Sequence, residues 1–133
     1  MALLTRAADA SVDASTAMFA PQISGLVAGE AIAACAACYV KAADGLVYNS
    51  NGTAADAAAK VDGFSAQAAT AGQGVTLFGP GLRMRYGTGL TIAALYYLGT
   101  TAGRLDTAAT TGGTVAVAKA ITSTDVVIIN RVP

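Results

Sequence analysis

The clearest pattern in this chain is a succession of short apolar runs separated by turns rich in Gly, Thr and Ala, from Val61 to Asn130. The most regular alternation is at 82–86, where three apolar side chains face one side of a predicted strand and two arginines face the other. In the run 114–121, Val115, Val117 and Ile121 are expected to share a face. The other predicted strands are 61–66, 75–78, 94–98 and 126–129.

Two local signals precede these runs. The segments 38–41 and 46–48 flank an Asp44-Gly45 step, which is typical of a β-hairpin because Gly adopts the positive φ that such a turn requires. The segment 53–60 (TAADAAAK) predicts one short helix, because Ala favours helix and Thr53 suits the N-cap. The whole pattern predicts a mainly β fold, a small antiparallel β-sandwich or barrel with one short helix. Jelly roll, immunoglobulin-like sandwich and small barrel all remain open.

The first 28 residues follow neither the strand nor the helix period. Pro21 interrupts any continuous helix there. We therefore expect an extended N-terminal arm at 1–28 and a β domain at 29–133. A frayed tail is the alternative, but Phe19 and the apolar cluster at 23–27 favour an arm that docks on something.

Composition predicts a modest core and a partly covered surface. The chain has 133 residues, enough for one domain, and its 54% hydrophobic content is largely Ala, which buries little area. Charged residues make up only 12%, against a usual value of about 25%, so a monomer would be poorly protected against association. A small core and few charges both favour a protein that forms oligomers or binds a large partner.

Charge and hydropathy exclude several partners. Eight basic residues balance eight acidic ones, so nothing attracts the chain to nucleic acid. No apolar run reaches the roughly 18 residues that a membrane helix needs, and no cationic segment leads into an apolar stretch at the N-terminus. We expect a protein without membrane or nucleic-acid partners, made in a cytoplasm.

Groups that support catalysis are scarce. The chain contains no His, so no Ser or Cys can form a dyad with one. Cys35 and Cys38 have CxxC spacing but enter a predicted strand rather than open a helix, and a structural zinc site needs four ligands; buried thiols are the favoured interpretation. The Gly-rich segments 79–81 and 87–89 precede strands and are interpreted as turns, not phosphate loops. An Asp–Asp acid–base pair stays open, although Asp44 is better explained by its turn. We predict no enzyme activity, no cofactor and no metal.

A set of strand and glycine segments recurs in an order typical of one known family. The segments are Ala28-Gly29-Glu30-Ala31, Cys38-Tyr39-Val40-Lys41, Asp44-Gly45, Val47-Tyr48, 53–60, Val61-Asp62-Gly63-Phe64, Val75-Thr76-Leu77-Phe78, Met84-Arg85-Tyr86-Gly87-Thr88-Gly89-Leu90, Leu95-Tyr96-Tyr97-Leu98, Thr110-Thr111-Gly112, Val117-Ala118 and the β-branched strand that follows Ile121. This succession, from about Ala28 to Asn130, resembles the bacteriophage capsid cement (decoration) proteins. Cys35 and Cys38 are not part of the family pattern.

The resemblance implies a structural virion protein on the outer capsid surface. Such a protein would bind the major capsid protein, cement neighbouring capsomers and stabilise the expanded, DNA-filled head. It would act as a homo-oligomer, with a trimer favoured. Arg83 and Arg85 are weaker candidates for contact, since a solvated sheet face explains them better. The candidate capsid or subunit contacts are Leu3, Leu4, Met18, Phe19, Ile23, Arg83 and Arg85.

Three other functions compete with this hypothesis. A virion-surface module that binds a receptor or glycan is the main alternative, although the lack of Trp argues against it. A thiol enzyme using the two cysteines is the second. A tail or head-completion protein is the third, and only its copy number per virion would separate it from a cement protein.

Overall fold

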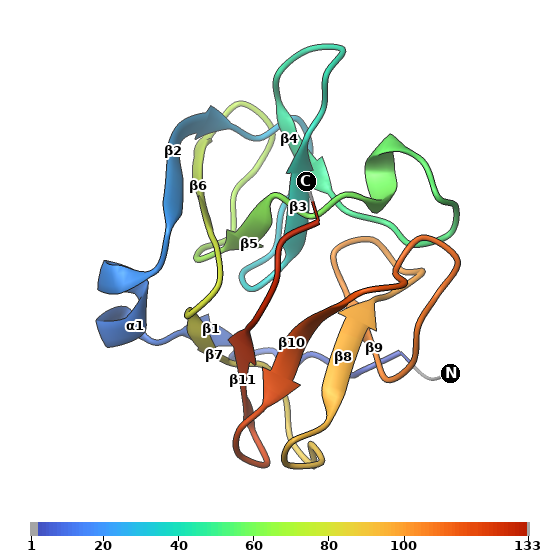
Figure 1. Cartoon of the computed structure of the whole chain (residues 1–133). Coiled ribbons are helices and arrows are strands. Elements are labelled where there is room, and N and C mark those ends of the chain that lie inside the picture. The colour runs from blue at the N-terminus through green and yellow to red at the C-terminus, as the bar shows by residue number, and fades with distance from the viewer. Residues whose placement is uncertain (1–2, 133) are drawn as a thin grey trace.

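Alternating apolar positions build two antiparallel sheets, which the computed structural model describes over residues 3–132 (Figure 1). The six-stranded sheet has the order β1-β7-β11-β10-β8-β9, and the five-stranded sheet has the order β2-β6-β5-β3-β4. The prediction of a mainly β fold, a small antiparallel β-sandwich or barrel, is confirmed. The elements are β1 (Ser11–Val12), α1 (Ala14–Phe19), β2 (Gln22–Val27), β3 (Ala37–Val40), β4 (Val47–Asn49), η1 (Ala57–Ala59), β5 (Gly63–Ser65), β6 (Gly74–Phe78), β7 (Arg83–Arg85), β8 (Leu95–Leu98), β9 (Leu105–Asp106), β10 (Ala116–Ala120) and β11 (Asp125–Ile128).

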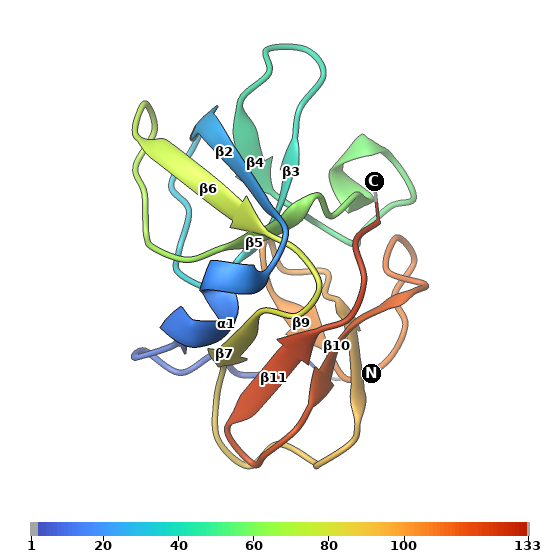
Figure 2. The same ribbon diagram turned by 60° about the vertical axis from the view of Figure 1, so that its left-hand side comes forward.

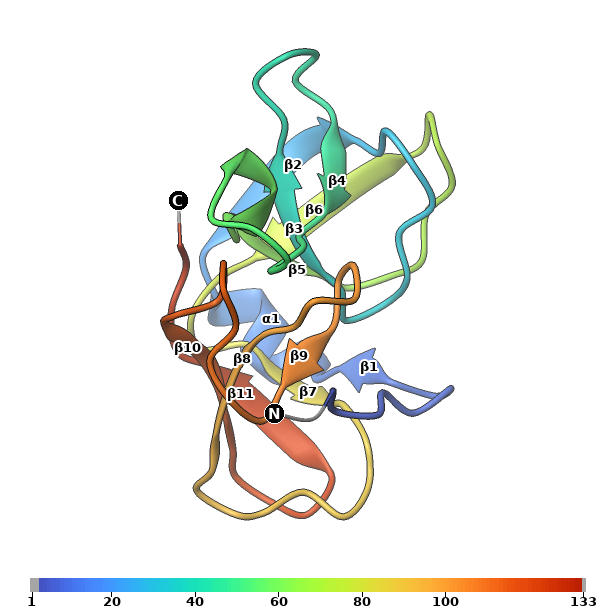
Figure 3. The same ribbon diagram turned by 90° about the vertical axis from the view of Figure 1, so that its right-hand side faces the viewer.

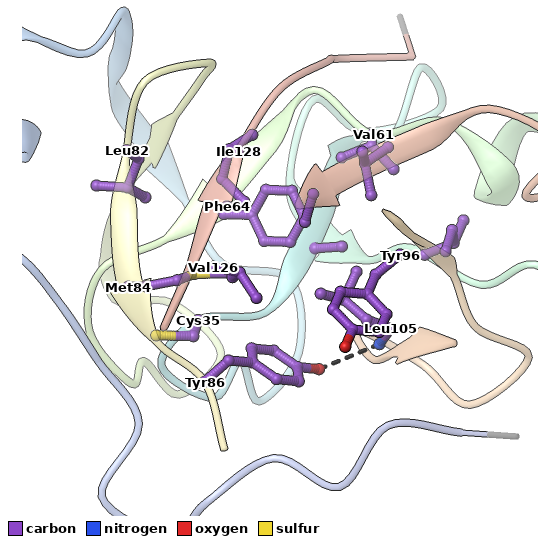
Figure 4. Packing of buried hydrophobic residues seen from close by; sticks show 14 of the residues in the cluster. Cys35, Val61, Phe64, Leu82, Met84, Tyr86, Tyr96, Leu105, Val126 and Ile128 are labelled. Atoms are coloured by element: carbon purple, nitrogen blue, oxygen red, sulfur yellow. Dashed lines mark hydrogen bonds between the residues drawn. The ribbon is translucent and has the colours of Figure 1, made fainter. Parts of the chain in front are cut away.

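The five-stranded sheet separates two apolar cores. One face of this sheet contributes Phe64 and Phe78 to the larger core, which also takes the inward side chains of the six-stranded sheet (Figure 4). The other face contributes Cys38 and Leu77 to the smaller core. In the larger core the backbone N–H of Leu105 donates to the Tyr86 hydroxyl at 3.1 Å, so the buried phenol has a partner.

The strands predicted from the cleanest patterns are present. Leu82, Met84 and Tyr86 are fully buried, and the β7 arginines between them face outward, as the alternation predicts. The predicted hairpin also forms, with Tyr39 opposite Tyr48 in the β3–β4 register. These segments fold as expected because their side-chain period matches a sheet that is buried on one face.

The first 28 residues are not an arm separate from the β domain. β1 pairs with β7 and β2 pairs with β6, so residues 11–27 form an edge of both sheets. The sequence hides this because the segment leaves one sheet after two paired residues and enters the other after a helix. Its register also shifts between Ile23 and Leu26, near Gly25 at φ 78°.

The helices differ from the prediction. α1 forms where none was expected: the Asp13 side chain accepts from the Thr16 N–H, and Pro21 follows the C-cap. In the segment 53–60 only η1 forms, and its N-cap is Asp56 rather than Thr53. Tertiary hydrogen bonds override the helix propensity of that segment, since its backbone bonds to residues 50 and 51.

The expected shared face of Val115, Val117 and Ile121 is wrong. Val117 is fully buried, whereas Val115 and Ile121 are 47% and 36% exposed. β10 pairs with β8 through a register shift between Ala116 and Ala118, and this irregularity places two consecutive residues inside. Ile121 consequently faces outward, on the side of Lys119.

Short bridges connect the outer edges of each sheet. Residues 3–12, which we call the N-terminal strap, bridge to β9 through Leu3 and pair with β7 through β1, so the strap joins the two edge regions of the six-stranded sheet (Figure 3). Ala28, just after β2, bridges to Val47 of β4 and so joins the edges of the five-stranded sheet. Each sheet therefore curves toward a small barrel. α1 lies at the corner between the two sheets (Figure 2).

Candidate docking surfaces

The structure divides the seven predicted contact residues into free and occupied ones. Leu3 is 37% exposed and bridges to β9, Leu4 packs against the larger core, and Ile23 packs against the smaller core. Met18 and Phe19 are 74% and 86% exposed. Of the predicted apolar anchors, these two are therefore the ones available to a partner.

Met18 and Phe19 form a charge-free surface on α1, which we call the corner surface together with the adjoining hollow. The hollow has a volume of about 320 Å³ and is lined by Ser15, Thr16, Phe19, Ala20 and Gly81. α1 itself contains no charged residue and buries none of its side chains completely. A large aromatic side chain beside an apolar hollow is the arrangement expected of an interface anchor.

Local hydrogen bonds fix the corner surface to both sheets. The Thr16 hydroxyl donates to the Asp13 carbonyl at 3.1 Å and accepts from the Arg83 N–H at 2.9 Å. At the other end, the Gln22 side-chain amide donates to the Ala17 carbonyl at 2.8 Å. The helix is thus tied to β7 on one side and to β2 on the other, which holds Phe19 outward between them.

A second exposed surface is the outer side of the six-stranded sheet, which we call the sheet face. The register places Arg83, Val127, Lys119 and Leu95 in one row across four strands. β8 lies three strand spacings from β7, about 14 Å away. Leu95 and Ile121 are the exposed large apolar side chains on this face, and Ile92 and Val115 are exposed in the segments that lead into β8 and β10.

The two predicted arginines lie side by side on the sheet face, but both have acidic neighbours. Arg83 Nε lies 2.8 Å from Asp125 Oδ2, and Arg85 Nε lies 3.6 Å from Asp9 Oδ2. Burial alone would raise the pKa of Asp125, but hydrogen bonds from Thr124 and Arg83 and the arginine charges outweigh it and hold that pKa below its usual range. The two arginines are therefore better described as members of solvated ion pairs than as a free anion-binding site.

The two cysteines are buried free thiols on opposite sides of the five-stranded sheet. Cys35 belongs to the larger core and Cys38 to the smaller one. Burial raises the pKa of Cys35 to about 11 and that of Cys38 to about 12, so neither forms a thiolate near neutral pH. The prediction of buried thiols is confirmed. Among residues 3–132, no three His, Cys, Asp or Glu side chains gather as a metal site.

The β3–β4 hairpin carries a small aromatic and acidic cluster. The Tyr48 hydroxyl donates to Asp44 Oδ2 at 2.7 Å, which lowers the pKa of Asp44. The Lys41 ammonium lies 4.8 Å from the centre of the Tyr48 ring, and Tyr39 lies beside that ring at 6.3 Å. These groups already contact one another, so the cluster is better explained as a structural part of the hairpin than as a binding site.

Sequence reasoning missed the apolar part of the sheet face. Leu95 was assigned only to a strand, and Ile121 was placed on the wrong side because the register shift in β10 leaves no sequence signal. Ile92 lies in the turn before β8 and carries no periodicity, and Val115, directly before β10, was expected to share a face with the buried Val117. Comparison with protein-family models, curated proteins and solved structures found no match. In the part of the chain that the structure describes, no helix is long and apolar enough to cross a membrane.

Proposed function

We propose that this chain is a structural virion protein that binds the outer surface of a phage capsid and cements neighbouring capsomers. Its partner would be the major capsid protein, together with further copies of itself, with a trimer favoured. It would be made in the host cytoplasm and would carry out no catalysis. The observation that carries the proposal is that a small β domain exposes large apolar side chains in two separate places, at the corner surface and along the sheet face.

The exposure of the corner surface supports a docking role. An aromatic side chain contributes roughly 150–250 Å² when it is fully buried, and its burial is worth about 25 cal/mol per Å². Leaving Phe19 86% exposed forgoes most of that stabilisation. The adjoining hollow supplies the concave contact that such a side chain needs from its own molecule.

The size of each surface supports attachment at several points. A stable interface buries about 800 Å² on each partner, which is more than Met18 and Phe19 supply together. The sheet face, which extends about 14 Å from β7 to β8, can reach a different part of a large partner. Binding at two points would add avidity, and a protein that binds only the assembled shell stabilises that shell by mass action.

Co-sedimentation with heads of the phage that encodes the chain tests the proposal. Purified protein is mixed with mature and with unexpanded heads, and bound copies are counted per head. Saturable binding at hundreds of copies on mature heads is expected. Binding to neither form would overturn the proposal and direct attention to a receptor- or glycan-binding role.

Point variants show which surface is used. Phe19→Ser is expected to weaken binding at least tenfold, because it removes an exposed anchor without touching the core. Val27→Ser is the matched control, since Val27 is 38% exposed on β2 and lies outside both surfaces. Deletion of residues 1–28 is unsuitable, because that segment forms an edge of both sheets.

A further inference from the structure

The N-terminal strap lies against two glycines of the six-stranded sheet and is extended except for a turn in which the Ala10 N–H donates to the Ala7 carbonyl at 3.2 Å. A side chain at Gly87 would place its Cβ 2.5 Å from the Thr5 carbonyl oxygen. A Cβ at Gly99 would lie 2.8 Å from the Leu3 side chain. Both glycines therefore leave the space that the strap occupies. They lie on opposite sides of β8 in the sequence, so this space, which we call the groove, is built from two separate turns.

The groove holds the strap mainly through backbone atoms. The Leu4 N–H donates to the Leu105 carbonyl at 2.8 Å, and the Ala7 N–H donates to the Tyr86 carbonyl at 2.7 Å. The Arg104 Nη2 donates to the Leu4 carbonyl at 3.0 Å. This is the mode in which an extended peptide adds to a sheet, where main-chain hydrogen bonds supply the affinity. The groove recognises this extended segment whichever copy of the chain supplies it.

α1 can serve as the hinge between the strap and β2. Its six residues span about 9 Å as a helix but about 20 Å when extended, so opening α1 adds about 11 Å of reach. None of its residues is completely buried, so opening the helix costs mainly the packing of Ala17 against the larger core and the hydrogen bonds that tie Thr16 and Ala17 to the neighbouring strands. The hinge also carries Met18 and Phe19. Two opened hinges running side by side would cover these exposed side chains, a contact that the closed monomer lacks.

We propose that the strap exchanges between two copies, so that residues 3–12 of each copy occupy the groove of the other. The paired contacts at β7 and β9 are the same in the monomer and in the exchanged dimer. The exchanged dimer differs from two monomers only by the new contact between the hinges. Because its formation depends on protein concentration, exchange is favoured where copies are crowded. The proposal concerns the isolated protein and does not depend on capsid binding.

A pair of engineered cysteines tests the exchange. Ser11 and Arg85 are exposed and directly opposite in the β1–β7 register, so Ser11→Cys with Arg85→Cys can form a disulfide across that pair. The native thiols are fully buried and protonated, and they stay outside this reaction. Protein is held at low micromolar and at near-millimolar concentration, oxidised, and analysed on non-reducing gels. Mass spectrometry of mixed heavy- and light-isotope copies identifies the linked peptides.

The expected result is a heavy–light disulfide between the thiols introduced at positions 11 and 85, and its share should rise at least tenfold with concentration. The matched control is Arg83→Cys with Val127→Cys, an opposed pair whose two members both lie after the hinge. This control should stay intrachain at every concentration. A disulfide between positions 11 and 85 that is purely intrachain throughout would overturn the proposal. Equal interchain linkage in the control would also overturn it, because random collision would then explain the dimer.

Discussion

Replacing Gly87 by Ala tests whether the N-terminal strap is part of the folded domain. The added Cβ would lie 2.5 Å from the Thr5 carbonyl oxygen, whereas ordinary contact begins at 3.4 Å. The strap must therefore move by about 0.9 Å. A shift of that size would lengthen the bond from the Ala7 N–H to the Tyr86 carbonyl from 2.7 Å to about 3.6 Å, beyond hydrogen-bonding distance.

The cost follows from the bonds that the strap makes. Losing the hydrogen bonds of the Ala7 and Leu4 amides lowers the free energy of unfolding by about 1 kcal/mol each. Replacing Gly by Ala also restricts the unfolded chain, which raises the free energy of unfolding by about 0.4–1 kcal/mol. We expect a net loss of about 1–2 kcal/mol in the free energy of unfolding. For a domain of this size that corresponds to a fall of roughly 4–8 °C in Tm.

Thermal unfolding and amide hydrogen exchange measure this effect, with Gly74→Ala as the matched control. A Cβ at Gly74 would meet only the Leu26 carbonyl at 3.8 Å, so this variant should unfold at the wild-type temperature or up to about 4 °C above it. In Gly87→Ala the amides of Leu4 and Ala7 should also exchange faster. Equal Tm values for the two variants, with unchanged protection of Leu4, would show that the strap does not occupy the groove.

Three further predictions concern the core, the thiols and the sheet face. Thr110→Val should lower the free energy of unfolding, measured in urea, by about 1–3 kcal/mol, because the buried hydroxyl donates to the Leu98 carbonyl at 2.7 Å and accepts from the Gly113 N–H. An unchanged urea midpoint would contradict this. The thiols of Cys35 and Cys38 should resist alkylation while the protein is folded. The free energy of unfolding should fall as pH rises from about 9 toward 12, because the folded state keeps protons on both thiols that the unfolded state releases. Cys38→Ala should weaken this pH dependence. Arg83→Ala should lower the free energy of unfolding by less than about 1 kcal/mol in urea unfolding, because the ion pair with Asp125 is partly exposed. The contribution of Asp125 to stability should disappear as pH falls below about 4, because its pKa is lowered in the folded state.

The sequence patterns that predicted the fold correctly are those with one buried and one exposed face. The alternation at 82–86 identified both the buried side chains of β7 and its outward arginines. The Asp44-Gly45 step identified the β3–β4 hairpin, in which Gly45 has φ 73°. In both cases the local signal and the tertiary environment agree, so the period of the sequence is also the period of burial.

The failures occur where one segment serves two environments. Residues 11–27 pair with one sheet, form a helix and then pair with the other, so no single period extends through them. The register shift in β10 moves Ile121 outward and hides the apolar part of the sheet face. Met18 and Phe19 could be selected as anchors because large apolar residues stand out in an Ala-rich segment. Leu3, Leu4 and Ile23 were selected by the same reasoning but are occupied within the domain.

The N-terminal segment has two roles that usually belong to different parts of a protein, completing the sheets and presenting a surface to a partner. Its strands complete both sheets through backbone pairing, and its helix presents the most exposed large hydrophobic side chain of the described residues. Any change that frees the segment to reach a partner therefore also uncovers β6 and β7, whose edges would be open to other strands. A point substitution on α1 separates the two roles, because Phe19→Ser alters the surface offered to a partner while leaving the strand pairing in place. This is why the binding test depends on α1 variants, and the strap test on Gly87 and on the Ser11–Arg85 pair.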